Sequence, residues 1–269
     1  AGDMVRPLFN KIQQSPLLSY GFRSFFLLAG GFAVLAVILW LLLLHGKTNT
    51  IAPAQPLFWH MHEMLFGFIG AAMAGFLLTA VPAWTGQAPL QGIKLAGFVL
   101  VWCLGRLVMW FNLVLPTVWV ASIDILFPLL LTLIVFNQLI AGGNRRNYPL
   151  GGLISLFALG NIIYHLGELN WLDNGQSVLY LMPHWVVLLV VIISGRIIPS
   201  FTANWLKLQN NQHTLPTKNP LLERTVLLLT LITGIVLFMS PHGMLSASLA
   251  FISALAHGLR LAGWRGWQA

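Results

Sequence analysis

The sequence predicts an all-α membrane protein, a polytopic bundle of eight transmembrane helices with both termini on the cytoplasmic side. Composition, the lengths of the apolar runs and the positions of Lys and Arg each point to this fold class. Of the 269 residues, 58% are hydrophobic and only 7% are charged, whereas a soluble domain carries about 25% charged residues. So few charges cannot cover the surface of a water-soluble protein.

The apolar runs have the length that a bilayer requires. A hydrocarbon layer of about 30 Å needs roughly 20 apolar residues at a rise of 1.5 Å per residue. Runs of this length predict spans at 24–44, 60–82, 93–113, 118–140, 149–167, 178–200, 221–239 and 242–262. We expect one membrane domain over 1–269, with a permanent first helix rather than a signal peptide. The segment 202–220 is expected to be a connecting loop, with a hinge between two groups of helices as the alternative.

The basic residues set the orientation, because cytoplasmic loops carry the excess of Lys and Arg. With the N-terminus inside, only Lys47 falls on the outer side. The cytoplasmic side receives Arg6, Lys11, Arg23, Lys94, Arg145, Arg146, Lys207, Lys218, Arg224, Arg260 and Arg265. This asymmetry explains the net charge of +8 without nucleic acid as a partner, and it predicts the cytoplasmic membrane as the location and the lipid bilayer as the surroundings.

The second predicted span has small residues at Gly67, Ala71 and Gly75, one every four positions. Such a stripe lets another helix approach closely. His60 and Glu63 fall on this side of the helix by spacing. We therefore expect both side chains to face the bundle rather than lipid.

Five histidines on four predicted helices share one depth near the outer face: His60, His62, His165, His184 and His242. Imidazole is the commonest metal ligand and an axial ligand of noncovalent haem, and facing helices of a bundle build such sites. These five residues and Glu63 are therefore candidate metal or haem ligands. The alternative for each single histidine is a hydrogen-bonded structural role.

Other polar residues at membrane depth allow two interpretations each. His60 and His62 are about 200° apart around a helix, so a regular helix cannot direct both at one metal. Arg106 and Asp124 are expected to form a buried ion pair on adjacent helices, and the alternative is that Arg106 pairs with a haem propionate. Near the inner face, Pro199 should weaken the last turn of the sixth span.

His257 and Arg260 lie at a depth similar to that of Pro199. They could form a second polar site, or Arg260 could simply extend to the headgroups. The single cysteine, Cys103, excludes a disulfide and the Cys-x-x-Cys-His motif of covalent haem. Any haem must therefore be held noncovalently, as a b-type group.

Two motifs resemble the NnrS family, membrane proteins associated with denitrification and nitric oxide stress and described as containing haem and copper. The first runs from His60-Met61-His62-Glu63-Met64 through Gly75-Phe76-Leu77-Leu78-Thr79 to Gly86, and the second is Gly195-Arg196-Ile197-Ile198-Pro199-Ser200-Phe201-Thr202. The resemblance covers nearly the whole chain. Members of the family are similar to longer, twelve-helix proteins, so the resemblance implies that the C-terminal third is absent here.

The resemblance implies a haem protein of the bacterial inner membrane, with copper as a second candidate cofactor, that handles nitric oxide or nitrosylated metal. It leaves the electron donor open. The alternative is a transporter with a polar path through the bundle, in which Arg196 and His257 reach the inner half. A third interpretation is a structural or assembly protein without chemistry of its own.

Overall fold

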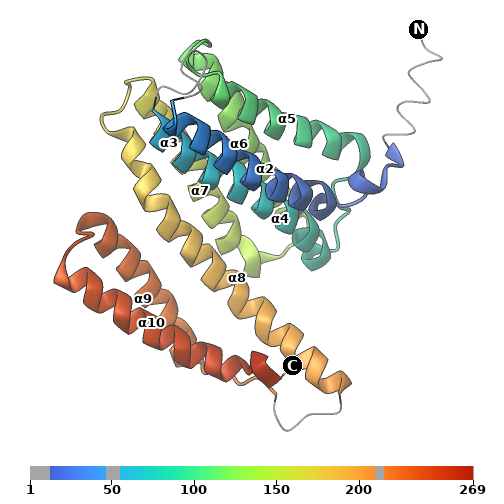
Figure 1. Ribbon diagram of the computed structural model, residues 1–269. Coiled ribbons are helices and arrows are strands. Elements are labelled where there is room, and N and C mark those ends of the chain that lie inside the picture. The colour runs from blue at the N-terminus through green and yellow to red at the C-terminus, as the bar shows by residue number, and fades with distance from the viewer. Residues whose placement is uncertain (1–12, 47–54, 210–214, 269) are drawn as a thin grey trace. The chain divides into compact units, whose positions relative to one another are not determined.

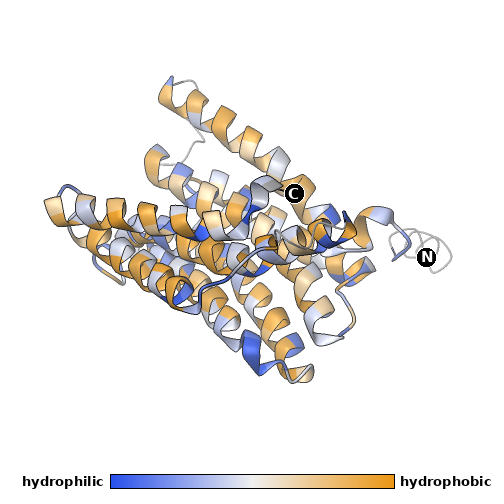
Figure 2. Ribbon diagram, turned by 90° about the horizontal axis from the view of Figure 1, so that it is seen from below, coloured by the Kyte–Doolittle hydropathy of each residue, from blue (hydrophilic) through white to orange (hydrophobic). Residues whose placement is uncertain are grey.

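A computed structural model describes residues 13–46, 55–209 and 215–268. Within these ranges the regular secondary structure is entirely helical, and eight helices are long and apolar enough to cross a membrane (Figure 1). Figure 2 shows that apolar residues dominate the long helices. Since a bilayer-spanning helix needs about 20 apolar residues, the predicted all-α fold with eight spans is confirmed.

The chain divides into two compact units, Ala1–Leu179 and Tyr180–Ala269, and each is described by itself. The helices of unit 1 are α2 (Gly21–Leu44), α3 (Pro56–His62), the π-helical segment η2 (Glu63–Ile69), α4 (Gly70–Thr85), α5 (Gly92–Trp110), α6 (Thr117–Ala141) and α7 (Tyr148–Glu168). Unit 2 contains α8 (Val178–Leu208) from Tyr180 onward, α9 (Pro220–Met239) and α10 (Met244–Trp264). Short 3-10 turns occur at Pro16–Leu18, Arg145–Asn147, Gly175–Ser177 and Gly266–Gln268.

In unit 1, α2 packs along η2 and α4, while α6 packs against α5 and α7. The predicted small-residue stripe makes the first of these contacts possible. A Cβ added to Gly67 would lie 2.6 Å from Phe32 of α2, and one added to Gly75 would lie 2.7 Å from Phe26. The expected close approach of another helix at this stripe is therefore confirmed, and α2 is that helix.

The second span is one apolar stretch, Pro56–Thr85, built from α3, η2 and α4. Its central π-helical segment begins at Glu63, directly after His62. π-helical turns are rare and occur frequently at functional sites. Here the change from α-helix to π-helix occurs between His62 and Glu63, two of the predicted ligand residues.

In unit 2, α9 packs along α10, and an ion pair between a buried arginine and a partly exposed glutamate joins them. Arg260 Nη2 lies 2.6 Å from Glu223 Oε2, and Arg260 Nη1 donates to the carbonyl oxygen of Val191 on α8 at 3.2 Å. Arg260 is 4% exposed, so its guanidinium is held by protein groups and does not extend to the headgroups as the alternative interpretation assumed.

The end of α8 differs from the prediction. The sequence predicts a span ending at 200 and weakened by Pro199, but α8 continues to Leu208. Pro199 has no N–H to donate to the carbonyl oxygen of Gly195, four residues earlier. Lys218 replaces that donor, because its Nζ lies 2.8 Å from Gly195 O. The helix therefore passes through the proline, and the loop expected over 202–220 is shortened by Thr202–Leu208.

That loop does not separate the two units, because the boundary between them falls at Leu179 and Tyr180. The last span also begins slightly later than predicted, at Met244 instead of 242. The other span ends differ from the predicted ones by four residues or fewer.

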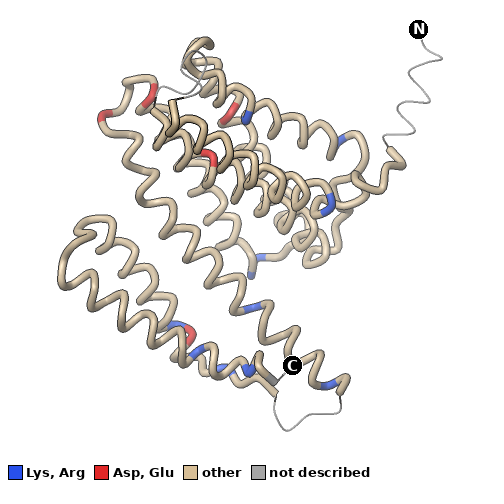
Figure 3. Tube along the Cα trace, viewed as in Figure 1, with Lys and Arg blue, Asp and Glu red and all other residues tan. Residues whose placement is uncertain are grey.

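The charged residues of unit 1 gather mostly near helix ends (Figure 3). Arg23 and Lys94 each lie in the first turn of a helix, and Arg145 and Arg146 precede α7. The positive-inside rule assigns membrane orientation from basic residues at such helix ends. Arg6, Lys11 and Lys47 lie outside the described residues, and the cytoplasmic position of both termini stays a prediction.

Candidate metal site

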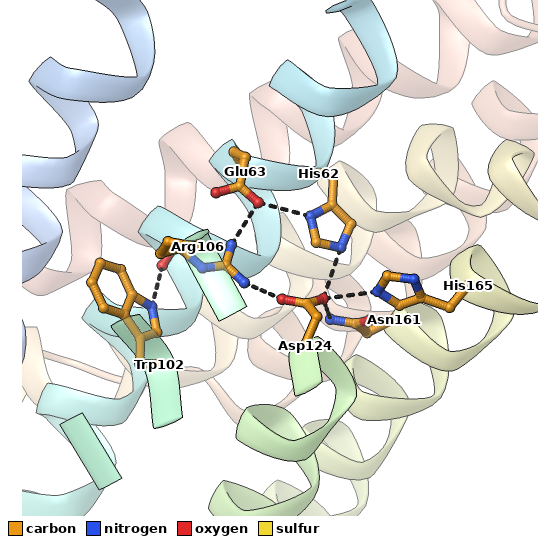
Figure 4. A network of polar contacts seen from close by, with 8 residues as sticks. His62, Glu63, Trp102, Arg106, Asp124, Asn161 and His165 are labelled. Atoms are coloured by element: carbon orange, nitrogen blue, oxygen red, sulfur yellow. Dashed lines mark hydrogen bonds and ion pairs between the residues drawn. The ribbon is translucent and has the colours of Figure 1, made fainter. Parts of the chain in front are cut away.

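A cluster of polar side chains lies inside unit 1, where five helical segments contribute residues (Figure 4). His62 ends α3 and Glu63 begins η2, while Arg106, Asp124 and His165 come from α5, α6 and α7. The side chains of His62, Glu63 and Asp124 are at most 1% exposed. Charged groups at such burial are costly unless they are paired or bind an ion.

Arg106 joins the two carboxylates of the cluster. Its Nη1 donates to Glu63 Oε1 at 2.7 Å, and its Nη2 pairs with Asp124 Oδ1. The expected ion pair between Arg106 and Asp124 is thus present, and Glu63 is an additional partner. Both terminal nitrogens of the guanidinium are therefore engaged by carboxylates of the protein.

Three side-chain nitrogen atoms lie within 3.2 Å of the other carboxylate oxygen of Asp124. Asn161 Nδ2 donates to Asp124 Oδ2 at 2.9 Å, and His165 Nε2 lies 2.9 Å from the same oxygen. His62 Nε2 lies 3.2 Å from it, but outside hydrogen-bond geometry. One carboxylate oxygen is consequently the centre on which two imidazoles from different helices converge.

The cluster contains an unusual number of buried polar atoms that have no hydrogen-bond partner among the described residues. These atoms are His62 Nε2, Glu63 Oε2, Arg106 Nε, Asn161 Oδ1 and His165 Nδ1. Native proteins leave few buried polar groups unsatisfied, and each one needs an explanation such as an ion or a water. Their concentration at one place indicates a site with room for a further chemical partner.

The donor set suits a metal ion. His62, Asp124 and His165 each offer one ligand atom, and these atoms lie within 4.8 Å of one another. Imidazole and carboxylate are ligands of zinc, non-haem iron and related divalent ions. The three residues could therefore hold one metal ion.

A pocket of about 320 Å³ adjoins the cluster and reaches His165. The segment between α5 and α6, including Asn112, forms one wall together with Thr117 at the start of α6, and the end of α7 forms another with Tyr164 and Glu168. The Tyr164 ring packs against the imidazole of His62 at 4.6 Å and that of His165 at 5.1 Å between centroids. Tyr164 therefore contacts both candidate ligands and the pocket.

The remaining predicted ligands have other surroundings. His60 stacks on Trp40 of α2, with ring centroids 4.0 Å apart, so His60 and His62 diverge as their spacing predicts. Glu63 faces the cluster, as expected, and its Oε1 lies 2.7 Å from Arg106 Nη1 and 3.1 Å from His62 Nδ1. His184 and His242 belong to unit 2: His184 packs near Gly234 of α9, and His242 is exposed in the turn before α10. Their roles as ligands stay predictions.

The sequence predicts no contact for Asn161, and it predicts Asp124 only as an ion-pair partner. A signal for Asn161 exists, because it lies four residues before His165 and hence on the same face of α7. Asp124 likewise precedes Pro128 by four residues, at a position where a regular helix loses a hydrogen bond. Neither signal identifies the partner residues on other helices.

The chain matches no curated protein and no solved structure. A family model described as NnrS protein matches residues 16–269. Because this match covers nearly all of the chain, the chain belongs to the NnrS family.

Proposed function

We propose that this chain is a metal-dependent protein of the bacterial inner membrane that takes part in nitric oxide metabolism or nitrosative stress tolerance. In this proposal its metal centre consists of His62, Asp124 and His165. One observation carries the proposal: the fully buried Nε2 of His62 lies 3.2 Å from Asp124 Oδ2 without a hydrogen bond. An ion bound by both atoms would give His62 Nε2 the partner that it lacks.

The position of the site suits a small gaseous ligand. Nitric oxide partitions into lipid, so it can reach a metal that is surrounded by membrane-spanning helices. A bound metal supplies the orbital that coordinates nitric oxide, and the protein supplies the ligands and a site poor in water. Membership of the NnrS family supports this assignment at the level of the family.

Haem, the other cofactor that the family resemblance implies, does not fit between His62 and His165. An axial histidine directs its nitrogen at an iron in the middle of a flat macrocycle. Here both Nε2 atoms lie within 3.2 Å of one oxygen of Asp124, which leaves no space for a macrocycle. A single ion, copper included, fits the cluster, and among the predicted ligands His60, His184 and His242 are left for a noncovalent b-type haem.

The transporter alternative gains no support from unit 2. His257 Nε2 and Thr230 Oγ1 lie 3.0 Å apart in a hydrogen bond, and Arg260 is paired with Glu223. Polar groups that line a substrate path should be free to meet the substrate. The paired groups of α9 and α10 instead join these two helices.

Nitric oxide titration of the purified chain tests the proposal. Metal content is measured first, and binding is then followed by optical and electron paramagnetic resonance spectra. We expect nitric oxide to bind the wild-type protein and not to bind the double variant that carries His62→Ala and His165→Ala. His45→Ala is the control, because His45 is exposed at the end of α2. A metal-free wild-type preparation that binds no nitric oxide would refute the proposed function.

A further inference from the structure

We infer that the pocket beside the cluster is the passage through which a metal cation enters the buried site, and that the Glu168 carboxylate draws the cation into it. The inference rests on the proposed function and adds the route by which the metal reaches its ligands. Four observations carry it: the place where the pocket opens, the groups that line it, the charge around its rim and the unoccupied oxygen of Glu168.

The ligand atoms of the proposed metal centre are closed off from the outside. His62 and Asp124 are fully buried, and His165 is 1% exposed. A metal ion does not cross packed apolar side chains, because stripping an ion of its water without offering other ligands is very costly. A metal centre at this depth therefore needs an entry path lined by polar groups.

The pocket joins these buried groups to one end of unit 1. Its rim contains Leu115 and Pro116 of the turn between α5 and α6, and both are exposed. The volume of about 320 Å³ exceeds the roughly 180 Å³ that six waters occupy at about 30 Å³ each. A cation with its first shell of water therefore fits inside.

Tyr164 and His165 form the inner end of the pocket, and both also contact the cluster. The Tyr164 ring packs against the imidazole of His62, with centroids 4.6 Å apart. His165 Nε2 lies 2.9 Å from Asp124 Oδ2. An ion that reaches these two side chains is therefore next to the proposed ligand set.

The polar groups of the lining suit a cation rather than an anion. Asn112, Thr117 and Glu168 offer oxygen atoms, which hard cations take as ligands. No Lys or Arg is among the described residues that line the pocket. Asn112 Oδ1 and His165 Nδ1 are buried and have no hydrogen-bond partner within the described part of the chain. Such groups can take the place of waters that an entering ion gives up.

The end of unit 1 around the pocket carries negative charge. Glu168 and Asp173 lie there, and the stretches 107–117 and 166–179 contain no Lys or Arg. A surface with one sign of charge raises the local concentration of the opposite ion and its rate of association. Cations are therefore concentrated at the mouth of the pocket.

Glu168 is held at the pocket with one oxygen unoccupied. Gln176 Nε2 donates to Glu168 Oε1 at 2.9 Å, and no hydrogen bond or ion pair with a described residue engages Oε2. A close approach of two glycines keeps Gln176 within reach, because a Cβ on Gly167 would lie 2.8 Å from Gly175 Cα. The second carboxylate oxygen is thus available to an entering cation.

Metal uptake by the stripped chain tests the inference. The full chain, purified in an uncharged detergent and treated with a chelator, is mixed with cobaltous ion, and the rise of visible absorption gives the uptake rate. Glu168→Gln keeps an acceptor for Gln176 but removes the charge. We expect this variant to take up cobalt about tenfold more slowly at low ionic strength, with the same final amount bound. Asp173→Asn is the matched control and should change the rate much less, since Asp173 is exposed at the same end but does not line the pocket.

Salt separates attraction of the cation from a structural defect of the variant. High ionic strength screens exposed charges, so the difference in rate between wild type and Glu168→Gln should shrink, whereas a distorted pocket would stay slow. Thr117→Lys, at an exposed position of the lining, should also slow uptake, because it places a positive charge in the passage.

Three results would overturn the inference and leave the proposed metal centre intact. These are uptake at the wild-type rate in both Glu168→Gln and Thr117→Lys, a defect that salt does not reduce, and an equal defect in Asp173→Asn. Retention of neither cobalt nor zinc by the wild-type chain would instead end the proposed metal centre, and the passage with it.

Discussion

Trp102 on α5 donates its indole N–H to the carbonyl oxygen of Gly67, at 3.1 Å. Gly67 lies inside the π-helical segment η2, which begins at Glu63. The bond therefore ties α5 to the irregular part of the second span. Since η2 begins immediately after His62, this contact helps to hold the helix start that places both His62 and Glu63 in the cluster.

Replacing Trp102 by Phe removes that donor and keeps an aromatic ring against Phe32. We expect a loss of about 1 kcal/mol in the free energy of unfolding, because one buried hydrogen bond is lost. Metal content should fall as well, since η2 becomes less well held. Thermal unfolding in detergent with metal analysis measures both. Trp205→Phe, at an exposed position, should change neither, and equal behaviour of the two variants would contradict the role of Trp102.

Replacing Arg106 leaves the two carboxylates of the cluster without their shared positive partner. In Arg106→Met, Glu63 and Asp124 lose their shared partner, and breaking a buried pair in this way costs about 3–5 kcal/mol. Thermal unfolding should show a large decrease in stability, while Lys94→Met, at an exposed position, leaves it unchanged. Adding Glu63→Gln to Arg106→Met should recover part of the loss, because one of the two unpaired charges disappears. No recovery would mean that charge is not the cause.

The close approach at Gly67 gives a matched pair of glycine variants. A Cβ at Gly67 would lie 2.7 Å from Arg106 Nη1, whereas a Cβ at Gly97 would meet nothing within 4 Å. Gly67→Ala should therefore destabilise the protein by about 1–3 kcal/mol, as overpacking does. Gly97→Ala should stabilise it by about 0.5–1 kcal/mol, because Ala is the better helix residue. The contrast would be refuted if the melting temperatures of both variants shifted in the same direction.

Local signals predict the spans and much of the candidate site. Apolar runs show the spans directly, and the buried ion pair between Arg106 and Asp124 follows from the cost of a lone charge in lipid. The convergence of His62 and His165 on Asp124 required the packing of α3, α6 and α7, which spacing along one helix does not encode. The π-helical start at Glu63 likewise has no periodic signature, and it lets two consecutive residues serve one cluster.

The extension of α8 past Pro199 could not be predicted for the same reason. A proline predicts a lost hydrogen bond, but the residue that replaces the donor lies far along the chain. From the sequence alone, Lys218 is predicted only to be a basic residue on the cytoplasmic side. Its contact with Gly195 becomes visible only in three dimensions.

Topology can be tested with single cysteines placed in a Cys103→Ala background. Arg145 precedes α7 and Asp173 follows it, and both are exposed. Because α7 is long and apolar enough to span the membrane, we expect the two positions to lie on opposite sides. If both termini are cytoplasmic, Asp173→Cys should react with an impermeant maleimide in intact cells, and Arg145→Cys only after the membrane is opened. The reverse pattern would invert the orientation.

A double-mutant cycle tests the replacement of a backbone donor by a side chain in α8. Lys218 Nζ donates to Gly195 O, the carbonyl that Pro199 cannot serve. Lys218→Met alone should cost about 1 kcal/mol, because the charged donor is exposed and water screens its hydrogen bond. In Pro199→Ala the restored N–H can bond Gly195 O, so the same lysine substitution should cost much less. Unfolding free energies that simply add would show that Lys218 does not substitute for the missing N–H.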